Sequence, residues 1–210
     1  MAGLFGWGAR RPAEPPAPAT SVDITATSIV LPRFLHAVSQ RPAPVLLDLG
    51  PVVGANVAFL GEQLGCRLLV GDMHRDLAAR NAAMPEEWRD AVIARLAKTV
   101  AMPLDGVLCW DLFDYFDRGT AQAVAVLLTS RLAPGGVVHG LFGTTPGELR
   151  CRTRYVIHSA SALTCRQEPA PPVKRGVLST RDLAVIFAGM KVTESVLLKN
   201  QRREILLRKA

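Results

Sequence analysis

The residues of this chain best suited to chemistry are acids and glycines that follow apolar runs. Residues 45–60 read VLLDLGPVVGANVAFL, in which an apolar run ends at Asp48 and is followed by Gly50 and Gly54. A strand that ends in an acid and a glycine-bearing turn, directly before a helix, presents bare backbone N–H groups to a ligand. The pattern therefore predicts a site for a nucleotide-like molecule at this turn.

Two further acids follow later apolar runs. Asp72 comes after RLLVG, about 20 residues beyond the glycine turn, where a carboxylate can accept two hydrogen bonds from a ribose diol. Asp111 comes after DGVLCW. Taken singly, each acid also fits the start of a loop or the cap of the next helix, and two glycines alone occur in many turns without a ligand.

Strands and helices that alternate along the chain must position these residues. Apolar runs predict strands at 44–48, 67–71, 105–110 and 136–143. The helical period predicts helices at 55–65, 84–100 and 120–132, the last capped by Thr120. Strands that alternate with helices pair in parallel through right-handed crossovers. We therefore expect an α/β, Rossmann-like doubly wound fold, with a mostly parallel sheet and helices on both faces.

The last third of the chain has a different character. RYVIHSASALTCRQ predicts a strand or strand pair, EPAPPVKRG predicts a proline-rich loop, and LSTRDLAVIFAGM predicts a helix capped by Ser179 or Thr180 and closed by Gly189. KVTESVLLK and RREILLRK flank Asn200 and Gln201. These two segments predict an antiparallel C-terminal hairpin on the parallel sheet.

Composition limits the class of protein. The chain has 210 residues, of which 49% are hydrophobic, and we expect a single domain over residues 23–210 after a disordered, Pro- and Ala-rich leader at residues 1–22. No apolar run reaches the roughly 20 residues of a membrane span, and no secretory signal is evident. The four cysteines form no C-x-x-C pair, so we expect reduced thiols and a cytoplasmic location.

The positive charge is concentrated late in the chain. Residues 146–210 hold 13 Lys and Arg against 5 Asp and Glu, within a net charge of +7. Such asymmetry can attract nucleic acid. However, Arg150, Arg152 and Arg154 alternate with less polar residues, as on the solvated face of a strand, and no aromatic platform or recognition helix accompanies them. Nucleic acid is thus an unfavoured partner.

The order of DLGPVVG, Asp72, WDLFDYF and LAPGG, together with the closing hairpin, resembles the class I S-adenosylmethionine-dependent methyltransferases over residues 40–209. The resemblance implies S-adenosylmethionine as cofactor, held by the turn of Gly50, Pro51 and Gly54. It implies that Asp72 binds the ribose, that Asp48 orients the methionine end, and that Trp110 and Asp111 lie beside the methionine and the reacting methyl.

Two departures from the family pattern stand out. Val52 occupies a position where the family usually has a further glycine, which would narrow the turn or shift the ligand outward. The family also often has another strand ending near the adenine, whereas this chain offers a long helix and then TVAMPLDG. Adenine recognition then falls to Met73, Met102 or backbone amides.

The resemblance also places acceptor recognition in residues 23–40 and 143–178. The second region carries Arg150, Arg152, Arg154, Arg166 and Lys174, so we expect a small-molecule acceptor, with an anionic one as a first hypothesis and Tyr115 and Arg152 as substrate-binding residues. No catalytic residue is assigned, because Asp114, Tyr115 and His139 cannot be ranked as a general base. His139 and His158 lack a second ligand at metal spacing, so no metal is expected.

Two other functions stay open. Val52 also fits a protein of the same fold that binds without catalysing. A nicotinamide- or flavin-dependent oxidoreductase shares the strand, turn and helix, but its G-x-G-x-x-G fingerprint would need glycines where Val52 and Ala55 stand. The oligomeric state and the acceptor's reacting atom do not follow from the sequence.

Overall fold

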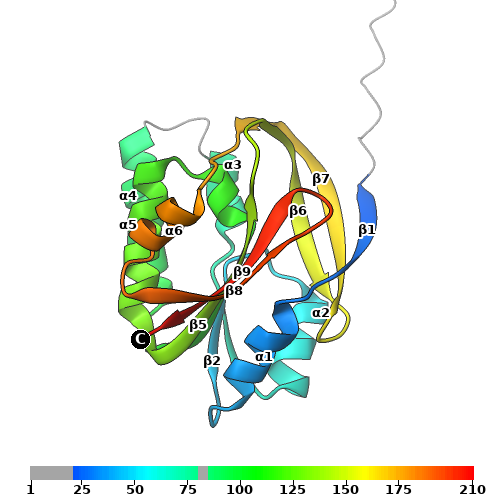
Figure 1. The fold of residues 1–210 in the computed structure, drawn as a ribbon, viewed down its shortest axis with the longest axis vertical. Helices are drawn as coiled ribbons and strands as arrows, with labels where there is room; N and C mark the ends of the chain where they lie inside the picture. The colour runs from blue at the N-terminus through cyan, green and yellow to red at the C-terminus, as the bar shows by residue number, and fades with distance from the viewer. Residues whose placement is uncertain (1–20, 80–84) are drawn as a thin grey trace, which may run out of the picture.

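The computed structural model describes residues 21–79 and 85–210 and contains two sheets (Figure 1). The larger sheet has six strands in the order β3-β2-β4-β5-β9-β8, and the smaller has three in the order β1-β7-β6. The predicted leader lies outside the described residues except for its last two positions. Val22, the second of these, begins strand β1 (Val22–Thr27), which the sequence did not predict.

The larger sheet confirms the predicted doubly wound topology. Its parallel strands are β2 (Val45–Asp48), β3 (Arg67–Val70), β4 (Leu104–Trp110) and β5 (Leu132–Gly143). The antiparallel pair β8 (Met190–Leu197) and β9 (Arg202–Lys209) completes it, with β9 next to β5. Within the described residues no strand lies between β3 and β4 in the chain, as the departure from the family pattern suggested.

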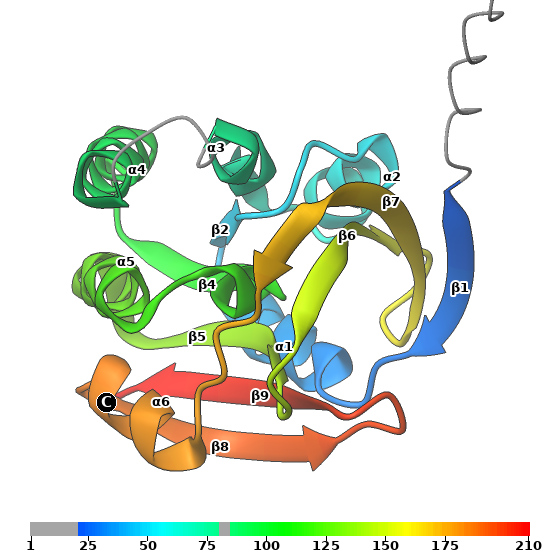
Figure 2. The same cartoon turned by 90° about the horizontal axis from the view of Figure 1, so that it is seen from above.

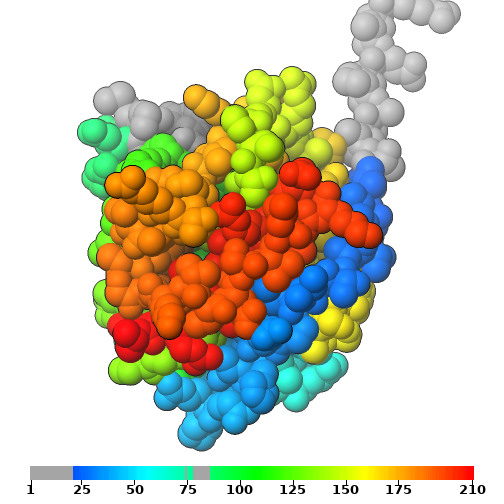
Figure 3. Space-filling model, viewed as in Figure 1, coloured from blue at the N-terminus to red at the C-terminus, as the bar shows by residue number. Residues whose placement is uncertain are grey.

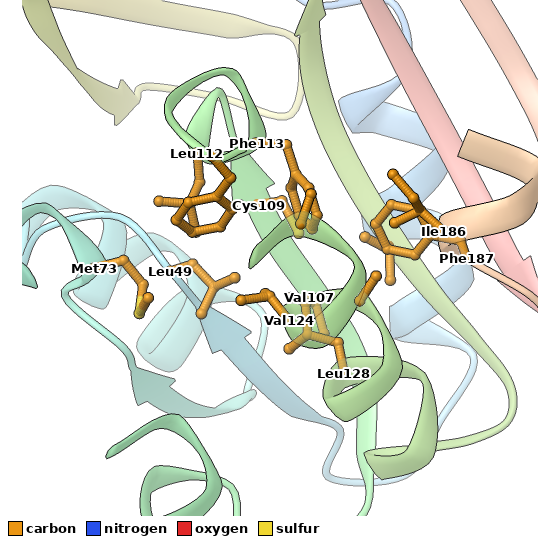
Figure 4. Close-up of a cluster of buried hydrophobic side chains, with 14 of the residues drawn as sticks. Leu49, Met73, Val107, Cys109, Leu112, Phe113, Val124, Leu128, Ile186 and Phe187 are labelled. Atoms are coloured by element: carbon orange, nitrogen blue, oxygen red, sulfur yellow. The ribbon is translucent and has the colours of Figure 1, made fainter. Parts of the chain in front are cut away.

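Helices cover both faces of the larger sheet (Figure 2). One face is covered by α3 (Met73–Ala79), α4 (Pro85–Thr99), α5 (Arg118–Arg131) and α6 (Thr180–Ile186). Figure 4 shows this core, in which side chains of the strands, of α5 and of α6 meet. The other face is covered by α1 (Leu31–Ser39), by α2 (Gly54–Val57) with its π-helical continuation (Ala58–Gln63), and by the smaller sheet.

The smaller sheet corrects the prediction of a proline-rich loop. Strands β6 (Glu148–Ile157) and β7 (Ala162–Lys174) form a long hairpin, and β7 runs through residues 169–172, which were predicted as loop. Strand β1 pairs with β7 only as far as Gln167. Beyond that point one side of β7 is an edge, where proline is tolerated because no N–H is needed on that side.

Two local predictions about helix ends are also corrected. Helix α5 is capped by Asp117, whose side chain accepts from the backbone N–H of Thr120, so Thr120 lies inside the first turn instead of capping it. Strand β5 begins at Leu132, directly after α5, and not at residue 136 as predicted, so it includes APGG, where Gly135 takes a φ of +74°. The prediction for α6 is confirmed, because Ser179 and Asp182 form a capping box and Gly189 takes a φ of +83° after the helix.

The closing hairpin and α1 lie side by side on one face of the molecule (Figure 3). Arg33 of α1 pairs with Glu194 of β8 at 2.7 Å. None of the helices in the described part of the chain combines the length and apolar character that a bilayer crossing requires.

Candidate functional site at the carboxyl ends of the strands

Strand β2 is the topological switch point of the larger sheet. It pairs in parallel with β3 on one side and with β4 on the other. The chain crosses from β2 to β3 in one direction and then returns past β2 to β4, so the strand order reverses at β2. Ligands of open α/β sheets bind outside the carboxyl ends of the strands at such a point. Asp48, Asp72 and Asp111 end or follow these three strands, so the structure brings the three predicted acids to one edge of the sheet.

Asp48 is buried beneath the glycine turn. Its Oδ1 accepts from the backbone N–H of Gly50 at 2.9 Å and from Nε1 of Trp110 at 2.7 Å. Burial raises the pKa of Asp48 to about 6, although these hydrogen bonds oppose the rise. Asp48 thus holds the glycine turn in place from the protein side. Its carboxylate bonds to Gly50 and Trp110, so the sequence-based expectation that Asp48 orients a cofactor would apply indirectly, through the positions of these two residues.

The two glycines of the turn have different surroundings. A Cβ at Gly50 would lie 3.0 Å from the Trp110 indole, so the protein itself fills the space that the missing side chain leaves. A Cβ at Gly54 would meet nothing within 4 Å, which leaves the start of α2 open to a ligand. Val52 is 58% exposed, so its side chain does not fill the turn.

Asp72 stands at the end of β3 with a strained backbone, at a φ of +43°. Its side chain is half-buried, and no side chain in the described part of the chain bonds to its carboxylate. Met73, predicted to contact the adenine, is instead a core residue: its side chain is fully buried beside Leu49, as Figure 4 shows, and its sulfur accepts from Arg95. Only the backbone of Met73 is left for such a role.

Trp110 separates the turn from the smaller sheet. It takes a φ of +49°, is 2% exposed, and stacks on Tyr155 of β6 with ring centroids 4.9 Å apart and planes 5° apart. Asn56 of α2 fastens the same strand, because its amide donates to the Tyr155 carbonyl at 2.9 Å and accepts from the Ile157 N–H at 2.8 Å. The stacked rings of Trp110 and Tyr155 therefore form a fixed wall.

A buried ion cluster lies at the ends of β4 and β5. Arg202 donates to Asp111 at 3.0 Å, to Asp114 at 2.7 Å and to the Tyr155 hydroxyl at 2.8 Å. Burial alone would lower the pKa of Arg202, but Tyr155 and the two carboxylates raise it, so the guanidinium stays charged. Burial raises the pKa of Asp114, and Arg202 opposes that rise. Oδ1 of Asp111 is buried and has no hydrogen-bond partner among the described residues.

Two adjoining cavities lie beyond this wall. The first, of about 190 Å³, lies between β1, β7 and β6 on one side and the ends of β5 and β9 on the other, and Tyr155 lines it. The second, of about 260 Å³, is lined by Asp111, Tyr115 and Arg175 among others. Both are lined by Thr153, Gln167, Asn200 and Arg202. We call the two cavities together the acceptor chamber.

Solved structures share this arrangement of strands and helices. An S-adenosylmethionine-dependent methyltransferase from Clostridium acetobutylicum ATCC 824 is 10% identical and superposes with a TM-score of 0.50, over 86% of this chain and 91% of that chain. The PH0226 protein from Pyrococcus horikoshii OT3 is 14% identical, with a TM-score of 0.52 over 86% of this chain and 88% of that chain. The chain has the class I methyltransferase fold. No family model and no curated protein sequence matches it.

Within this methyltransferase fold, the two predicted substrate-binding residues have different positions. Tyr115 lines the second cavity, but its hydroxyl donates to the Cys151 carbonyl at 2.9 Å. Arg152 is half-buried on β6 and is not among the residues that line either cavity. Pro51 is half-buried in the turn between Gly50 and Gly54.

His139, one of the three unranked candidates for a general base, bonds to another element of the fold. It is fully buried, and its Nε2 lies 2.8 Å from Glu204. Glu204 also accepts from Ser28 and from the backbone N–H groups of Ile29 and Val30, which fastens the start of α1 to β9. His139 therefore holds elements together, away from the acids of the switch point.

Sequence reasoning missed Arg202, which pairs with both buried acids that follow β4. A signal did exist: in an antiparallel pair, the first residues of the last strand lie at the carboxyl end of its partner. Arg202 is the first residue of β9 and pairs with Gly143, the last residue of β5. The predicted hairpin thus implied a cation beside Asp111 and Asp114.

Proposed function

We propose that this chain is an S-adenosylmethionine-dependent methyltransferase that acts on a small-molecule acceptor. The observation that carries the proposal is the Asp72 carboxylate at the end of β3, which none of the described side chains bonds and which stands beside an open glycine turn, at the switch point of a class I methyltransferase fold. These residues fit a nucleoside: Asp72 can accept from the two ribose hydroxyls, and the start of α2 offers backbone N–H groups.

When bound, S-adenosylmethionine would supply a methyl group on a sulfonium sulfur, and an in-line nucleophile would displace the neutral thioether from the methyl carbon. The chain's own residues then have to orient the reactants and exclude water, and orientation of this kind is worth roughly 7 to 11 kcal/mol in well-aligned systems. Trp110 and Tyr155 are suited to this task because their stacked rings are buried and form a rigid, water-excluding side of the site. We propose no catalytic base.

The first experiment is calorimetric titration with S-adenosylmethionine and S-adenosylhomocysteine. We expect Asp72→Ala to weaken both by about 1.5–3 kcal/mol, the value of a charge-assisted hydrogen bond. Asp90→Ala makes the same charge change at an exposed position of α4 and should leave both affinities unchanged. Equal affinities in wild type and Asp72→Ala would mean that Asp72 does not hold the ribose.

A second candidate is a binding module of the same fold without catalysis. It is favoured by the Trp110 indole, which occupies the space beside Gly50 and uses the Asp48 oxygen that a ligand would otherwise reach. Titration separates the candidates, because the module would give no heat with S-adenosylmethionine.

Thermal unfolding with a nicotinamide or flavin cofactor tests the oxidoreductase. A ligand present at 100 times its Kd raises the free energy of unfolding by about 2.7 kcal/mol. A cofactor that binds the folded protein therefore raises its Tm. We expect that shift with S-adenosylmethionine and none with NADH or FAD.

A further inference from the structure

The acceptor chamber has one apolar end and one polar end. Ile24 of β1, Leu141 of β5 and Leu163 of β7 line the first cavity. The Cys165 thiol lines it too, and burial raises its pKa to about 11, so at neutral pH this thiol is uncharged and behaves as a small apolar group. The first cavity also has polar residues in its lining, among them Ser28 and Glu204, but polar and charged residues make up most of the lining of the second. A molecule that occupies the whole chamber therefore has an apolar body and a polar end.

The cations that line the chamber are already paired. Within the described residues they are Arg150, Arg175 and Arg202, and each lies within 4 Å of a carboxylate: Glu148, Asp114, and both Asp111 and Asp114, respectively. Arg154 and Arg166 of the neighbouring strands pair in the same way, with Glu168 and Asp23.

The chamber also contains a carboxylate at its apolar end. Burial alone would raise the pKa of Glu204, but the hydrogen bonds from His139, Ser28 and the backbone lower it to about 2, so Glu204 is ionised at neutral pH. An anionic molecule in the chamber would therefore meet a carboxylate and find each cation already compensated. Of the arginines that suggested an anionic acceptor, Arg150 lines the chamber, and it is paired with Glu148.

Three buried side-chain atoms of described residues at the polar end have no hydrogen-bond partner: Nε of Arg175, Nε of Arg202 and Oδ1 of Asp111, of which Oδ1 of Asp111 is the acceptor. Oδ1 of Asp111 is buried and accepts no hydrogen bond within the described structure, while its Oδ2 accepts from Arg202. An unsatisfied buried acceptor is costly, and a donor supplied by a ligand would relieve that cost. Asp111 lines the second cavity, where such a donor would arrive.

We infer that the acceptor chamber takes an uncharged molecule with an apolar, ring-sized body and a hydroxyl or amino hydrogen-bond donor at one end, which Asp111 receives. This inference rests on the proposed function only in naming that molecule the methyl acceptor. The donor is then the group to be methylated: its oxygen or nitrogen would take the methyl group as the bond from carbon to the sulfonium sulfur breaks, S-adenosylhomocysteine would leave, and the proton would pass to water. An O-methylated product no longer has the hydrogen that Asp111 accepts, which weakens its binding.

The test compares three probes of nearly the same size by equilibrium dialysis at pH 7: 1-naphthol, which has the donor; 1-methoxynaphthalene, its methyl ether, which lacks it; and 1-naphthoate, which is an anion. We expect 1-naphthol to bind at least about tenfold more tightly than the ether, the lower end of what a hydrogen bond to a charged group contributes. We expect the anion to bind most weakly. Tightest binding of 1-naphthoate would overturn the inference, as would equal binding of 1-naphthol and its ether.

A matched pair of variants tests the location. Ile24 and Val22 lie on the same face of β1 and are 46% and 55% exposed, but only Ile24 lines the chamber. Ile24→Asp should weaken 1-naphthol at least about tenfold, whereas Val22→Asp should change it by less than about twofold. Equal affinities in the two variants would place the probe elsewhere and overturn the inference.

The same preparations separate this inference from the proposed function. The probes are measured without cofactor, and S-adenosylmethionine is titrated in parallel. If S-adenosylmethionine does not bind while 1-naphthol shows the expected pattern, the methyltransferase proposal fails and the chamber's selectivity stands. If S-adenosylmethionine binds while the probe pattern fails, only the inference about the acceptor is lost.

Discussion

The carboxyl ends of β2 and β3 are constructed differently from those of β4 and β5. At the first pair, Asp72 is half-buried and unbonded among the described residues, and the space at Gly54 is open. At the second pair, Asp111 and Asp114 are each 1% exposed and share the guanidinium of Arg202. Both pairs of strand ends carry carboxylates. Among the described residues, a cation of the protein pairs with the carboxylates that follow β4, but none pairs with Asp72.

The difference shows how charge can be used in two ways at one sheet edge. A buried carboxylate is destabilising without a counter-charge. The two acids at the ends of β4 and β5 therefore need a cation beside them, and their bonds to that cation make this part of the site rigid. A half-buried acid such as Asp72 costs little when it is unpaired. It can therefore be kept for a ligand without loss of stability.

Removing the shared cation should have the largest effect on this comparison. We expect Arg202→Met to lower the free energy of unfolding by about 3–5 kcal/mol, because it leaves buried carboxylates without a counter-charge. Urea unfolding at pH 7 measures it. The control is Arg150→Met, whose pair with Glu148 is mostly exposed and should be worth at most about 1 kcal/mol.

A double variant then tests the assigned cause. Adding Asp111→Asn to Arg202→Met removes one of the stranded charges and should restore part of the lost stability. A double variant that is destabilised by the sum of the single changes would contradict the role we give to the pairing of Arg202 with Asp111.

Asp48, the last residue of β2, should show an effect of intermediate size that depends on pH. Its pKa is about 6 in the folded protein against 3.8 when unperturbed, so the unfolded chain releases this proton first and the folded state loses stability as pH rises from about 4 to 6. Asp48→Asn keeps the acceptor oxygen but cannot ionise. The stability of the variant relative to wild type should therefore increase by about 2 kcal/mol between pH 4.5 and pH 7.

The same unfolding curves contain the control. Carboxylates elsewhere titrate identically in wild type and variant, so they cancel in the difference. A difference that stays constant over this pH range would mean that Asp48 titrates normally in the folded protein.

The smallest effect concerns Val52. The family pattern suggested that a valine crowds the turn, but the side chain is 58% exposed and does not enter it. We therefore expect Val52→Gly to change the affinity for S-adenosylhomocysteine by less than about 0.5 kcal/mol, as for most exposed positions. A gain of tenfold or more in calorimetry would show that the valine does obstruct the ligand.

The parts of the fold that follow from local periodicity could be predicted, and those that depend on distant partners could not. The parallel strands, the closing hairpin and the helix cap at Ser179 could each be predicted from one short, continuous stretch of sequence. The path of β7 through Pro169 and Pro171 was missed because tolerance of proline there depends on where β1 stops pairing, about 145 residues earlier in the chain.

The same division holds for the site. The sequence placed Asp48, Asp72 and Asp111 at one edge because parallel strands align their ends. It could not show that the Trp110 indole would fill the space beside Gly50, or that Met73 would point into the core, because both depend on side-chain directions set by packing. Arg202 was accessible only by combining the hairpin register with the need of two buried acids for a counter-ion.

The indole of Trp110 touches the glycine turn on one side and the Tyr155 ring on the other, so one side chain contributes to two neighbouring surfaces. Its Nε1 also donates to Asp48, which holds the ring in place. A substitution of Trp110 therefore cannot be confined to one of these surfaces, because removal of the ring opens the space beside Gly50 and at the same time leaves Tyr155 without its stacking partner.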